Sequence, residues 1–548
     1  MVLLASGLCK AQVPNLLNTL YLTPNTMFGF CEISDGVTDA QGNTYVVGSF
    51  HGTVEFDQTT LSSTTGGPQG FIAKLDATNN WTWAQRFGDP VNADGSHGFS
   101  VALDGIGGVY IAATLCGTNL SIGTAAISMP FPSGICVIKL NSSGSYAWTA
   151  TSDVGSVLGC DIVADAIGNV FLAGVWNPSG APVQFGPFIQ AAPGNNIDAF
   201  LAKIDQGGAW VWVKHFTSSG PALEFLNRDL LLDTAGNIVL GGIVYGAGAA
   251  IDGNQLAAHP ASDPFSTYIP FVAKWDQAGT LQWLSSIGNV HMGSFWLEAL
   301  EFDVSGNIAV LGSPIDTVDF GPFQVLDPGG TSAIHTMARL DPNGNWTNVR
   351  STSTSPSHVM DLLKLSTGEW LAMGTHNSTT FFSNDTLYCN GENDGFISVL
   401  DTSDQWLGGI GFGGVGWDFP KRLTIGPSLI RCVGSFEDVV VFGPDTLTCP
   451  PGLSCSFITT VDFSALGLSE EHHKVAGSIV VHPNPASASL VLTADASANT
   501  QVTIHDPSGR MVRSTPFTGA NMVVDVAGLR SGSYLIRVGH LHSRFVKD

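Results

Sequence analysis

The stretch Val37–Phe87 decides the fold of this chain. It reads VTDAQGNTYVVGSF over residues 37–50 and, after an irregular loop, FIAKLDATNNWTWAQRF over residues 71–87. In each half a polar turn containing Asp separates two runs rich in apolar, β-branched or aromatic residues. An Asp side chain accepts hydrogen bonds from the backbone N–H groups of a turn, and Gly supplies a positive φ. Each half therefore predicts a β-hairpin.

The same pair of hairpins returns six more times before residue 465. The first hairpin of each copy turns at a sequence related to Asp-x-x-Gly-Asn. It ends nine residues after the Asp position in a small residue: Gly48, Ala113, Gly174, Gly242, Gly312, Gly374 or Gly434. The spacings are 65, 61, 68, 70, 62 and 60 residues. Four strands per copy, without helical patterning, predict an all-β chain with a seven-bladed β-propeller over residues 12–465.

The second hairpin of each copy is marked by aromatic residues five and seven positions after an Asp or Asn. In the first copy Asp76 precedes Trp81 and Trp83, and in the third copy Asp205 precedes Trp210 and Trp212. A spacing of two residues places side chains on one face of a regular strand. We therefore expect both rings of a copy to be buried on the same face.

The ends of the repeat region predict how it closes. The seventh copy has a third strand, Phe457–Asp462, but no aromatic fourth strand, whereas Leu16–Leu22 precedes the first copy without a partner. We expect this N-terminal strand to complete the seventh copy and so remove the open edge of the sheet.

Units such as GNTYVVGSFHGTVEF and GFIAKLDATNNWTWA resemble the bacterial seven-bladed β-propeller repeat family, over about residues 35–465. That family is defined by its fold and not by an activity, so the resemblance implies architecture alone.

The first residues, MVLLASGLCKAQ, are typical of the end of a secretory signal peptide. A short apolar run precedes a small-residue site, which predicts a signal-peptide remnant over residues 1–11 and cleavage between Ala11 and Gln12. No apolar run is long enough to span a membrane. We expect a secreted protein.

The C-terminal segment differs from the repeats. After a polar linker over residues 466–477, residues 478–548 resemble the type A C-terminal sorting domain of type IX secretion substrates in Bacteroidota. The resemblance rests on Pro483, Asn484, Pro485, Asp506, Gly509, Arg510, Leu529, Gly532, Tyr534, Phe545, Val546 and Lys547. It implies a small immunoglobulin-like β-sandwich that partners with the type IX secretion machinery and a sortase-like peptidase. The protein would then be released or attached to the outer cell surface.

Charge and cysteine content set further bounds. The chain has 45 acidic and 21 basic residues, a net charge of −24, which argues against nucleic acid as a partner. Of its nine cysteines, eight remain after removal of the signal peptide, an even number that suits an oxidising compartment. Cys116 with Cys136, and Cys449 with Cys455, are candidate disulfide pairs, although the sequence leaves the connectivity open.

Candidate ligand-binding residues lie four positions before each turn Asp, where a first strand begins. In a propeller these positions lie near one mouth of the central channel, where they could hold a cation or a polyol such as a sugar. The alternative is that such Asp residues stabilise turns between blades. The candidates are Asp35, Asp161, Asp229, Asp361 and Lys421, with the adjacent Arg228 and Glu298.

Other chemistry has less support in the sequence. The repeated Asp turns could bind calcium, but each has a single acidic position, which favours plain hairpin turns over a cofactor. No catalytic or metal motif is recognised. These observations lead to two hypotheses. One is a secreted or surface-displayed binding or adhesion module, for example for a glycan, with no assigned catalysis. The other is an extracellular propeller-fold polysaccharide hydrolase or lyase, whose carboxylates distant blades would bring together.

Overall fold

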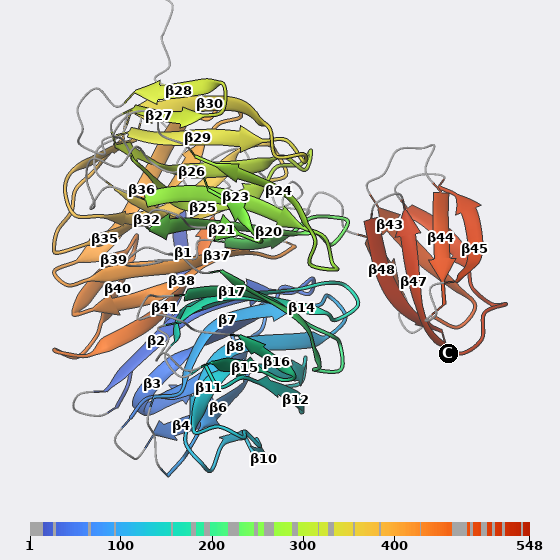
Figure 1. The fold of residues 1–548 in the computed structure, drawn as a ribbon. Coiled ribbons are helices and arrows are strands. Elements are labelled where there is room, and N and C mark those ends of the chain that lie inside the picture. The colour runs from blue at the N-terminus through green and yellow to red at the C-terminus, as the bar shows by residue number, and fades with distance from the viewer. Residues whose placement is uncertain are drawn as a thin grey trace, which may run out of the picture. The chain divides into compact units, whose positions relative to one another are not determined.

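The computed structural model divides the chain into two compact parts, Met1–Ser469 and Glu470–Asp548. All regular elements in the described residues are β-strands (Figure 1). The predicted signal peptide and linker lie outside these residues. The structure describes residues 15–547 apart from 26–28, 64–66, 92–94, 155–156, 177–181, 191–197, 217–228, 246–249, 257–267, 288–293, 316, 327–333, 354–356, 383–384, 428, 463–478, 483–485, 495–500, 507–509, 518–520 and 539–540.

The larger part consists of seven repeat units of four antiparallel strands, and the strands follow in sequential order in units one to six. Unit one contains β2 (Phe30–Thr38), β3 (Thr44–Phe56), β5 (Gln69–Leu75) and β6 (Trp81–Gly88). Unit two contains β7 (His97–Leu103), β8 (Gly108–Cys116), β11 (Ser133–Asn141) and β12 (Tyr146–Thr151). Unit three contains β13 (Val157–Ala164), β14 (Val170–Trp176), β17 (Asp198–Ile204) and β18 (Trp210–Phe216). Unit four contains β19 (Asp229–Leu232), β20 (Ile238–Tyr245), β23 (Tyr268–Trp275) and β24 (Leu281–Ser286).

The last three units have the same order. Unit five contains β25 (Ser294–Phe302), β26 (Ile308–Ile315), β29 (Ile334–Leu340) and β30 (Trp346–Ser353). Unit six contains β31 (His358–Lys364), β32 (Trp370–His376), β35 (Asp394–Leu400) and β36 (Trp406–Gly414). Unit seven contains β37 (Asp418–Ile425), β38 (Ile430–Glu437), β41 (Ser454–Asp462) and, from the other end of the chain, β1 (Asn15–Leu22).

Short strands also follow the second strand of each unit, mostly as small hairpins. They are β4 (Thr59–Ser63), β9 (Ser121–Ile122), β10 (Ala125–Ala126), β15 (Val183–Phe185), β16 (Phe188–Gln190), β21 (Ala250–Ile251), β22 (Asn254–Gln255), β27 (Thr317–Phe320), β28 (Phe323–Leu326), β33 (Thr380–Phe382), β34 (Asp385–Leu387), β39 (Val439–Phe442) and β40 (Asp445–Thr448).

The polar turns form as the sequence predicts. In unit one, Asp39 Oδ1 accepts hydrogen bonds from the backbone N–H groups of Gln41 and Asn43, both at 2.9 Å, while the Asn43 side chain donates to Asp39 Oδ2 at 2.8 Å. Gly42 has a φ of 83°, which a residue with a side chain rarely adopts. Both oxygens of Asp39 are therefore used to fix the hairpin.

The tryptophan pairs do not share a face, and this expectation was wrong. Trp81 lies opposite Leu75 and Trp83 opposite Lys74, so the register shifts by one residue between the two rings. Because neighbouring positions of β5 face opposite ways, the bulge directs the rings to opposite sides of the sheet. Trp81 packs edge-on against Phe56 of its own unit at 5.0 Å, whereas Trp83 Nε1 donates to the carbonyl oxygen of Ser142 in unit two at 3.3 Å.

The core of the larger part lies between the units. Each buried apolar cluster joins residues of two consecutive units, and one of these clusters joins unit seven to unit one through Val433, Ile458, Ile33 and Phe50. The first strands of the units also contact each other in the order β2, β7, β13, β19, β25, β31 and β37, and β37 contacts β2 again. The series of units therefore returns to its beginning.

The closing strand was predicted correctly. β1 pairs antiparallel with β41, with Leu16 opposite Val461 and Leu22 opposite Ser456, as the blue strand among the orange ones of unit seven in Figure 1. Leu16 belongs to the buried cluster between units six and seven, and Leu22 to the cluster between units seven and one. The first and last strands of the larger part are therefore paired with each other.

A substitution in β1 tests this closure. Leu16→Ala is expected to lower the free energy of unfolding by about 2 kcal/mol, because it removes a buried side chain from the core. The neighbouring Leu17 is 38% exposed, so Leu17→Ala is a matched control with an expected loss below about 0.5 kcal/mol. Equal effects of the two substitutions in urea denaturation would contradict a packed closing strand.

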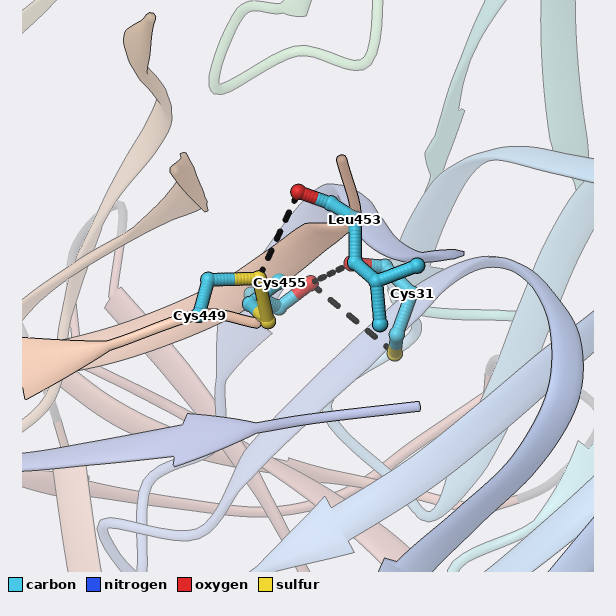
Figure 2. Close-up of a disulfide and its surroundings, with 5 residues drawn as sticks. Cys31, Cys449, Leu453 and Cys455 are labelled. Atoms are coloured by element: carbon cyan, nitrogen blue, oxygen red, sulfur yellow. Dashed lines mark hydrogen bonds between the residues drawn. A yellow bond between two sulfur atoms is a disulfide. The ribbon is translucent and has the colours of Figure 1, made fainter. Parts of the chain in front are cut away.

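One of the two candidate disulfides forms. Cys449 and Cys455 are joined, and nearby Ser456 Oγ donates to the carbonyl oxygen of Cys31 at 2.9 Å, which ties β41 to β2 (Figure 2). The pairing of Cys116 with Cys136 was wrong. Cys136 lies opposite Ala113 on β8, three positions from Cys116, a separation of about 10 Å along a strand that no disulfide spans.

The smaller part contains two antiparallel sheets that share one buried apolar cluster. One sheet has β42 (Ile479–His482), β43 (Ser489–Ala494) and β46 (Asn521–Asp525). The other has β45 (Met511–Pro516), β44 (Gln501–His505), β47 (Gly532–Val538) and β48 (Leu541–Lys547).

The residues on which the sorting-domain resemblance rests are partly described. Tyr534 stacks on Phe545 at 5.6 Å, and its hydroxyl donates to the carbonyl oxygen of Arg530 at 2.9 Å. Arg510 donates to Asp506 at the turn between β44 and β45. Pro483, Asn484, Pro485 and Gly509 lie outside the described residues.

Candidate functional site

The first strand of each unit brings one residue to a common position. In five units the pairing with the second strand shifts just before this position, and the residue then lies opposite the one that precedes the closing small residue. We call it the ring position. Its seven occupants are Asp35, Ser100, Asp161, Asp229, Ala299, Asp361 and Arg422.

The four carboxylates at the ring position bind neighbouring units through the backbone. Asp35 Oδ2 accepts from the N–H of Val101 at 2.9 Å, and Asp161 Oδ2 from that of Leu230 at 3.0 Å. Asp229 Oδ2 accepts from Leu300 at 2.7 Å, and Asp361 Oδ2 from Leu423 at 2.6 Å. In every case the donor follows the ring position of the next unit. Each carboxylate therefore fixes the position of one first strand, along its own direction, relative to the first strand of the next unit.

Ser100 extends this network between the first three units. Its hydroxyl lies 2.7 Å from Asp35 Oδ2 and 2.8 Å from Asp161 Oδ1. Asp161 Oδ1 also accepts from the N–H of Ile162 at 2.8 Å. Asp35, Ser100 and Asp161 thus form a continuous hydrogen-bonded chain across units one to three.

Arg422 connects ring positions that are far apart in the sequence. Its Nη1 lies 3.2 Å from Asp229 Oδ1 and 3.6 Å from Asp361 Oδ1, and its Nε lies 3.5 Å from Asp35 Oδ1. The side chain is 31% exposed, so solvent still reaches the guanidinium. With the Arg422 contacts, every oxygen of the four carboxylates has a partner.

The ring carries more acid than base. Glu301, two positions after Ala299, adds a fifth carboxyl group and accepts from the N–H of Phe302 at 2.7 Å. Burial raises the pKa of Asp35 to about 6 and that of Glu301 to about 7, while the charge of Arg422 opposes both shifts. Burial also raises the pKa values of Asp229 and Asp361, and their charges in turn hold the pKa of Arg422 well above its ordinary value. The arrangement favours a partly protonated set of acids around one fixed cation.

Lys421 does not occupy the ring position, and the prediction for this unit was displaced by one residue. In units one to six, five residues separate the paired ends of the first two strands, but in unit seven only residues 426–429 do so. Counting back from Gly434 therefore gives Lys421 instead of Arg422. Lys421 Nζ lies 5.2 Å from the centre of the Phe419 ring, and burial lowers its pKa.

Glu298 is buried beside two histidines from other strands. Its carboxylate lies 3.4 Å from His335 Nε2 and 3.7 Å from His358 Nδ1, and it accepts from the Ser313 hydroxyl at 3.0 Å. The nearby imidazoles hold the pKa of Glu298 at about 2 against the effect of burial. His358 is 73% exposed, so this group links a buried carboxylate to solvent through an imidazole.

A second group of side chains, outside the ring position, lies close to Lys421. Burial and the charge of Lys421 lower the pKa of His97 to about 4, while the charge of Glu32 opposes the lowering of the Lys421 pKa. The first strands of units one, two and seven therefore lie close together here. Phe419 stacks on Trp417, with ring centres 5.5 Å apart, and Trp417 is 40% exposed. We call Glu32, His97, Trp417, Phe419 and Lys421 the mouth residues.

The remaining sequence expectations concern Arg228, metal binding and membrane spans. Arg228 lies outside the described residues. Within the described ranges, no three His, Cys, Asp or Glu side chains are grouped so that they could hold a metal ion. In the same part of the chain, no helix is long and apolar enough to cross a membrane.

Sequence reasoning missed Arg422, Glu301, His335 and His358. A signal for Arg422 was present, because the residue after the ring position is apolar in five other units: Val101, Ile162, Leu230, Leu300 and Leu362. In unit seven this residue is Leu423, which places Arg422 in the ring. The histidines have no such linear signal, since they come from separate strands of units five and six.

Comparison with known proteins identifies the smaller part. Residues 480–547 match the family model described as the secretion system C-terminal sorting domain, which agrees with the resemblance found in the sequence. This tail indicates export through type IX secretion, to the outside of the cell or to its outer surface. A search of curated protein sequences gives no significant match.

Several solved structures are similar to the chain at low sequence identity. A protein of unknown function from Dyadobacter fermentans is 10% identical, with 66% of this chain and 93% of that chain covered and a TM-score of 0.35. PorZ, a surface component of the type IX secretion system of Porphyromonas gingivalis, is 10% identical, with 97% and 100% covered and a TM-score of 0.20. An ulvan lyase of polysaccharide lyase family 25 is 11% identical, with 74% and 92% covered and a TM-score of 0.37. Scores this low do not indicate a shared function.

Proposed function

We propose that residues 12–465 form a closed seven-bladed propeller that acts, after type IX export, as a binding module at or beyond the outer cell surface. The return of the first strands from β37 to β2 and the pairing of β1 with β41 support the closed ring. In this proposal the immunoglobulin-like tail, residues 478–548, serves the secretion machinery and is removed by a sortase-like peptidase.

The hydrogen bonds of the ring carboxylates argue that a ligand binds outside the ring position. Every oxygen of Asp35, Asp161, Asp229 and Asp361 is engaged by a backbone N–H, by Ser100 or by Arg422. A ligand at these atoms would have to displace bonds that hold the units together. We therefore assign the ring a mainly structural role, and its predicted role in ligand binding stays a prediction.

We place the ligand contacts at the mouth residues. The exposed Trp417 stacked on Phe419 offers an apolar ring face. Lys421 lies over Phe419, with Glu32 and His97 near Lys421, and these side chains supply donors and acceptors. An aromatic face bordered by polar groups suits a sugar ring, which has apolar C–H faces and hydroxyl edges. The proposed ligand is a glycan.

A glycan-binding screen of the purified protein tests this assignment. Trp417→Ala is expected to weaken binding to any glycan identified by about tenfold, because exposed tryptophans often dominate such interfaces. Val304→Ala is the control: Val304 is 66% exposed but lies in the turn at the opposite end of a first strand. If binding persisted unchanged in Trp417→Ala, the mouth would not be the binding surface.

The group of Glu298, His335 and His358 favours a second candidate, an extracellular polysaccharide hydrolase or lyase. A buried, ionised carboxylate behind an exposed imidazole is an arrangement used in general acid–base catalysis. Glycans bound in the screen should therefore also be examined for cleavage products. Turnover that His358→Ala abolishes without loss of binding would replace the binding module with an enzyme.

A further inference from the structure

Two buried aspartates at the junction of units six and seven have oxygens without partners. Asp394 begins β35 and is 2% exposed, and Asp418 begins β37 and is fully buried. Asp394 Oδ2 accepts from the N–H of Asn390, and Asp418 Oδ2 from that of Gly414, both at 2.9 Å. The Oδ1 atoms of both residues are buried, and no hydrogen-bond partner for either lies within the described part of the chain.

The two carboxyl groups lie against consecutive residues of β36. Asp394 is next to Gly413, where an added Cβ would be 2.3 Å from Asp394 Cγ, and Asp418 is bonded to Gly414. The backbone N–H of Asp418 also donates to the carbonyl oxygen of Asn393 at 2.9 Å. One short stretch of backbone therefore holds both side chains.

The surroundings of this pair are acidic. Burial raises the pKa of Asp418 to about 8, and the charges of Asp394, Glu437 and Asp438 add to this rise. Burial raises the pKa of Asp394, whereas the charge of His376 and a hydrogen bond with the Cys389 side chain oppose this rise. No lysine or arginine is among the groups that act on either carboxyl. His376 is therefore the cationic side chain beside Asp394, whereas the groups that act on Asp418 include no cation, although a buried carboxylate requires one.

We propose that Asp394 and Asp418 bind a calcium ion between units six and seven. Both unpaired oxygens are hard ligands, and a site with two carboxylates leaves the remaining coordination to backbone carbonyls and water, as calcium accepts and zinc does not. The hairpin aspartates differ, because both oxygens of a residue such as Asp39 already accept hydrogen bonds within its turn. For an exported protein, a dissociation constant on the order of 10⁻⁴–10⁻³ M would suffice.

The test is thermal unfolding of the full chain at pH 7.5 with calcium, magnesium or EDTA. Calcium at ten times its dissociation constant is expected to raise the Tm by about 2 °C, and magnesium by less. Asp418→Asn and Asp394→Asn should each remove the response. Asp276→Asn is the matched control, since both oxygens of Asp276 are bonded within its hairpin. That variant should keep the response.

Binding can also be followed without any variant. Terbium, which replaces calcium, should show luminescence excited through Trp417, the residue next to Asp418, and calcium should displace it. Absence of both the terbium signal and the calcium shift in the unmodified protein would overturn the proposal. So would a protein stabilised only by lowering the pH, because the pair would then share a proton instead of an ion. Neither outcome depends on glycan binding at the mouth.

Discussion

Arg422→Met is expected to lower the free energy of unfolding by about 3 kcal/mol at pH 8, since it leaves buried carboxylates without their cation. The guanidinium of Arg422 contacts Asp35, Asp229 and Asp361 at once. Methionine keeps much of the volume of the side chain but none of its charge. The loss is placed at the lower end of the range for buried pairs because Arg422 is 31% exposed.

The effect of Arg422→Met depends on pH in a defined direction. The pKa of Asp35 is raised in the folded protein to about 6, above its ordinary value of 3.8, so the folded state binds more protons between these values. Stability from this group is thus present at low pH and is lost as the pH rises through about 6. Without Arg422, which opposes the rise, the folded pKa increases further. The free energy of unfolding of the variant should be close to that of the unmodified protein at pH 5 and much lower at pH 8.

Urea denaturation followed by tryptophan fluorescence makes the measurement. All thirteen tryptophans lie between residues 81 and 417, so the signal reports on the repeat units and not on the tail. Lys421→Met is the matched control, because this neighbour lies outside the ring and burial already disfavours its charge. Asp229→Asn combined with Arg422→Met should recover part of the loss. A loss that is the same at pH 5 and pH 8 would show that Arg422 acts by packing alone.

The repeat architecture could be predicted because its signals are local. A turn such as Asp39–Asn43 needs its Asp and Gly wherever it occurs, and the spacing of the closing residues counts the units. The pairing of β1 with β41 followed from a simple deficit: one strand too few at the end and one too many at the start. The turn signals depend on residues close together in the chain, whereas the closure, which joins Asn15–Leu22 to Ser454–Asp462, needed only a count of strands.

The errors arose where one residue changes the direction of a side chain. The bulge between Trp81 and Trp83 reverses one ring, and the turn of unit seven, one residue shorter than the others, moves the ring position from Lys421 to Arg422. Neither change alters composition or apolar periodicity. In a strand, a shift of one position exchanges the two faces. A register that is wrong by one residue therefore assigns the wrong side chain to the site.

The carboxylate network illustrates a different limit. Asp229 and Arg422 are 193 residues apart, and Glu298 meets His335 and His358 only because strands of units five and six lie side by side. The sequence could identify acidic ring positions, but not that backbone N–H groups of the next unit would use their oxygens. These hydrogen bonds decide whether the carboxylates are open to a ligand or hold neighbouring units together.

Removal of residues 478–548 is expected to abolish export, with the protein recovered inside the cells of a host that has type IX secretion. The tail matches the sorting-domain family and has its own buried core, separate from that of the repeat units. A fluorescent protein fused to residues 470–548, behind an N-terminal signal peptide, should conversely reach the medium or the cell surface. Immunoblots of cell and medium fractions, with protease accessibility of whole cells, make the measurement.

Two substitutions of the same kind separate the folded tail from its linear motifs. Ile536 is fully buried in the tail core, so Ile536→Asp should unfold the tail and block export while leaving every motif residue in place. Val523 is 68% exposed on β46, and Val523→Asp should be exported normally. Normal export of Ile536→Asp would mean that the machinery reads a short sequence. Export that survives deletion of the whole tail would remove the sorting function from it.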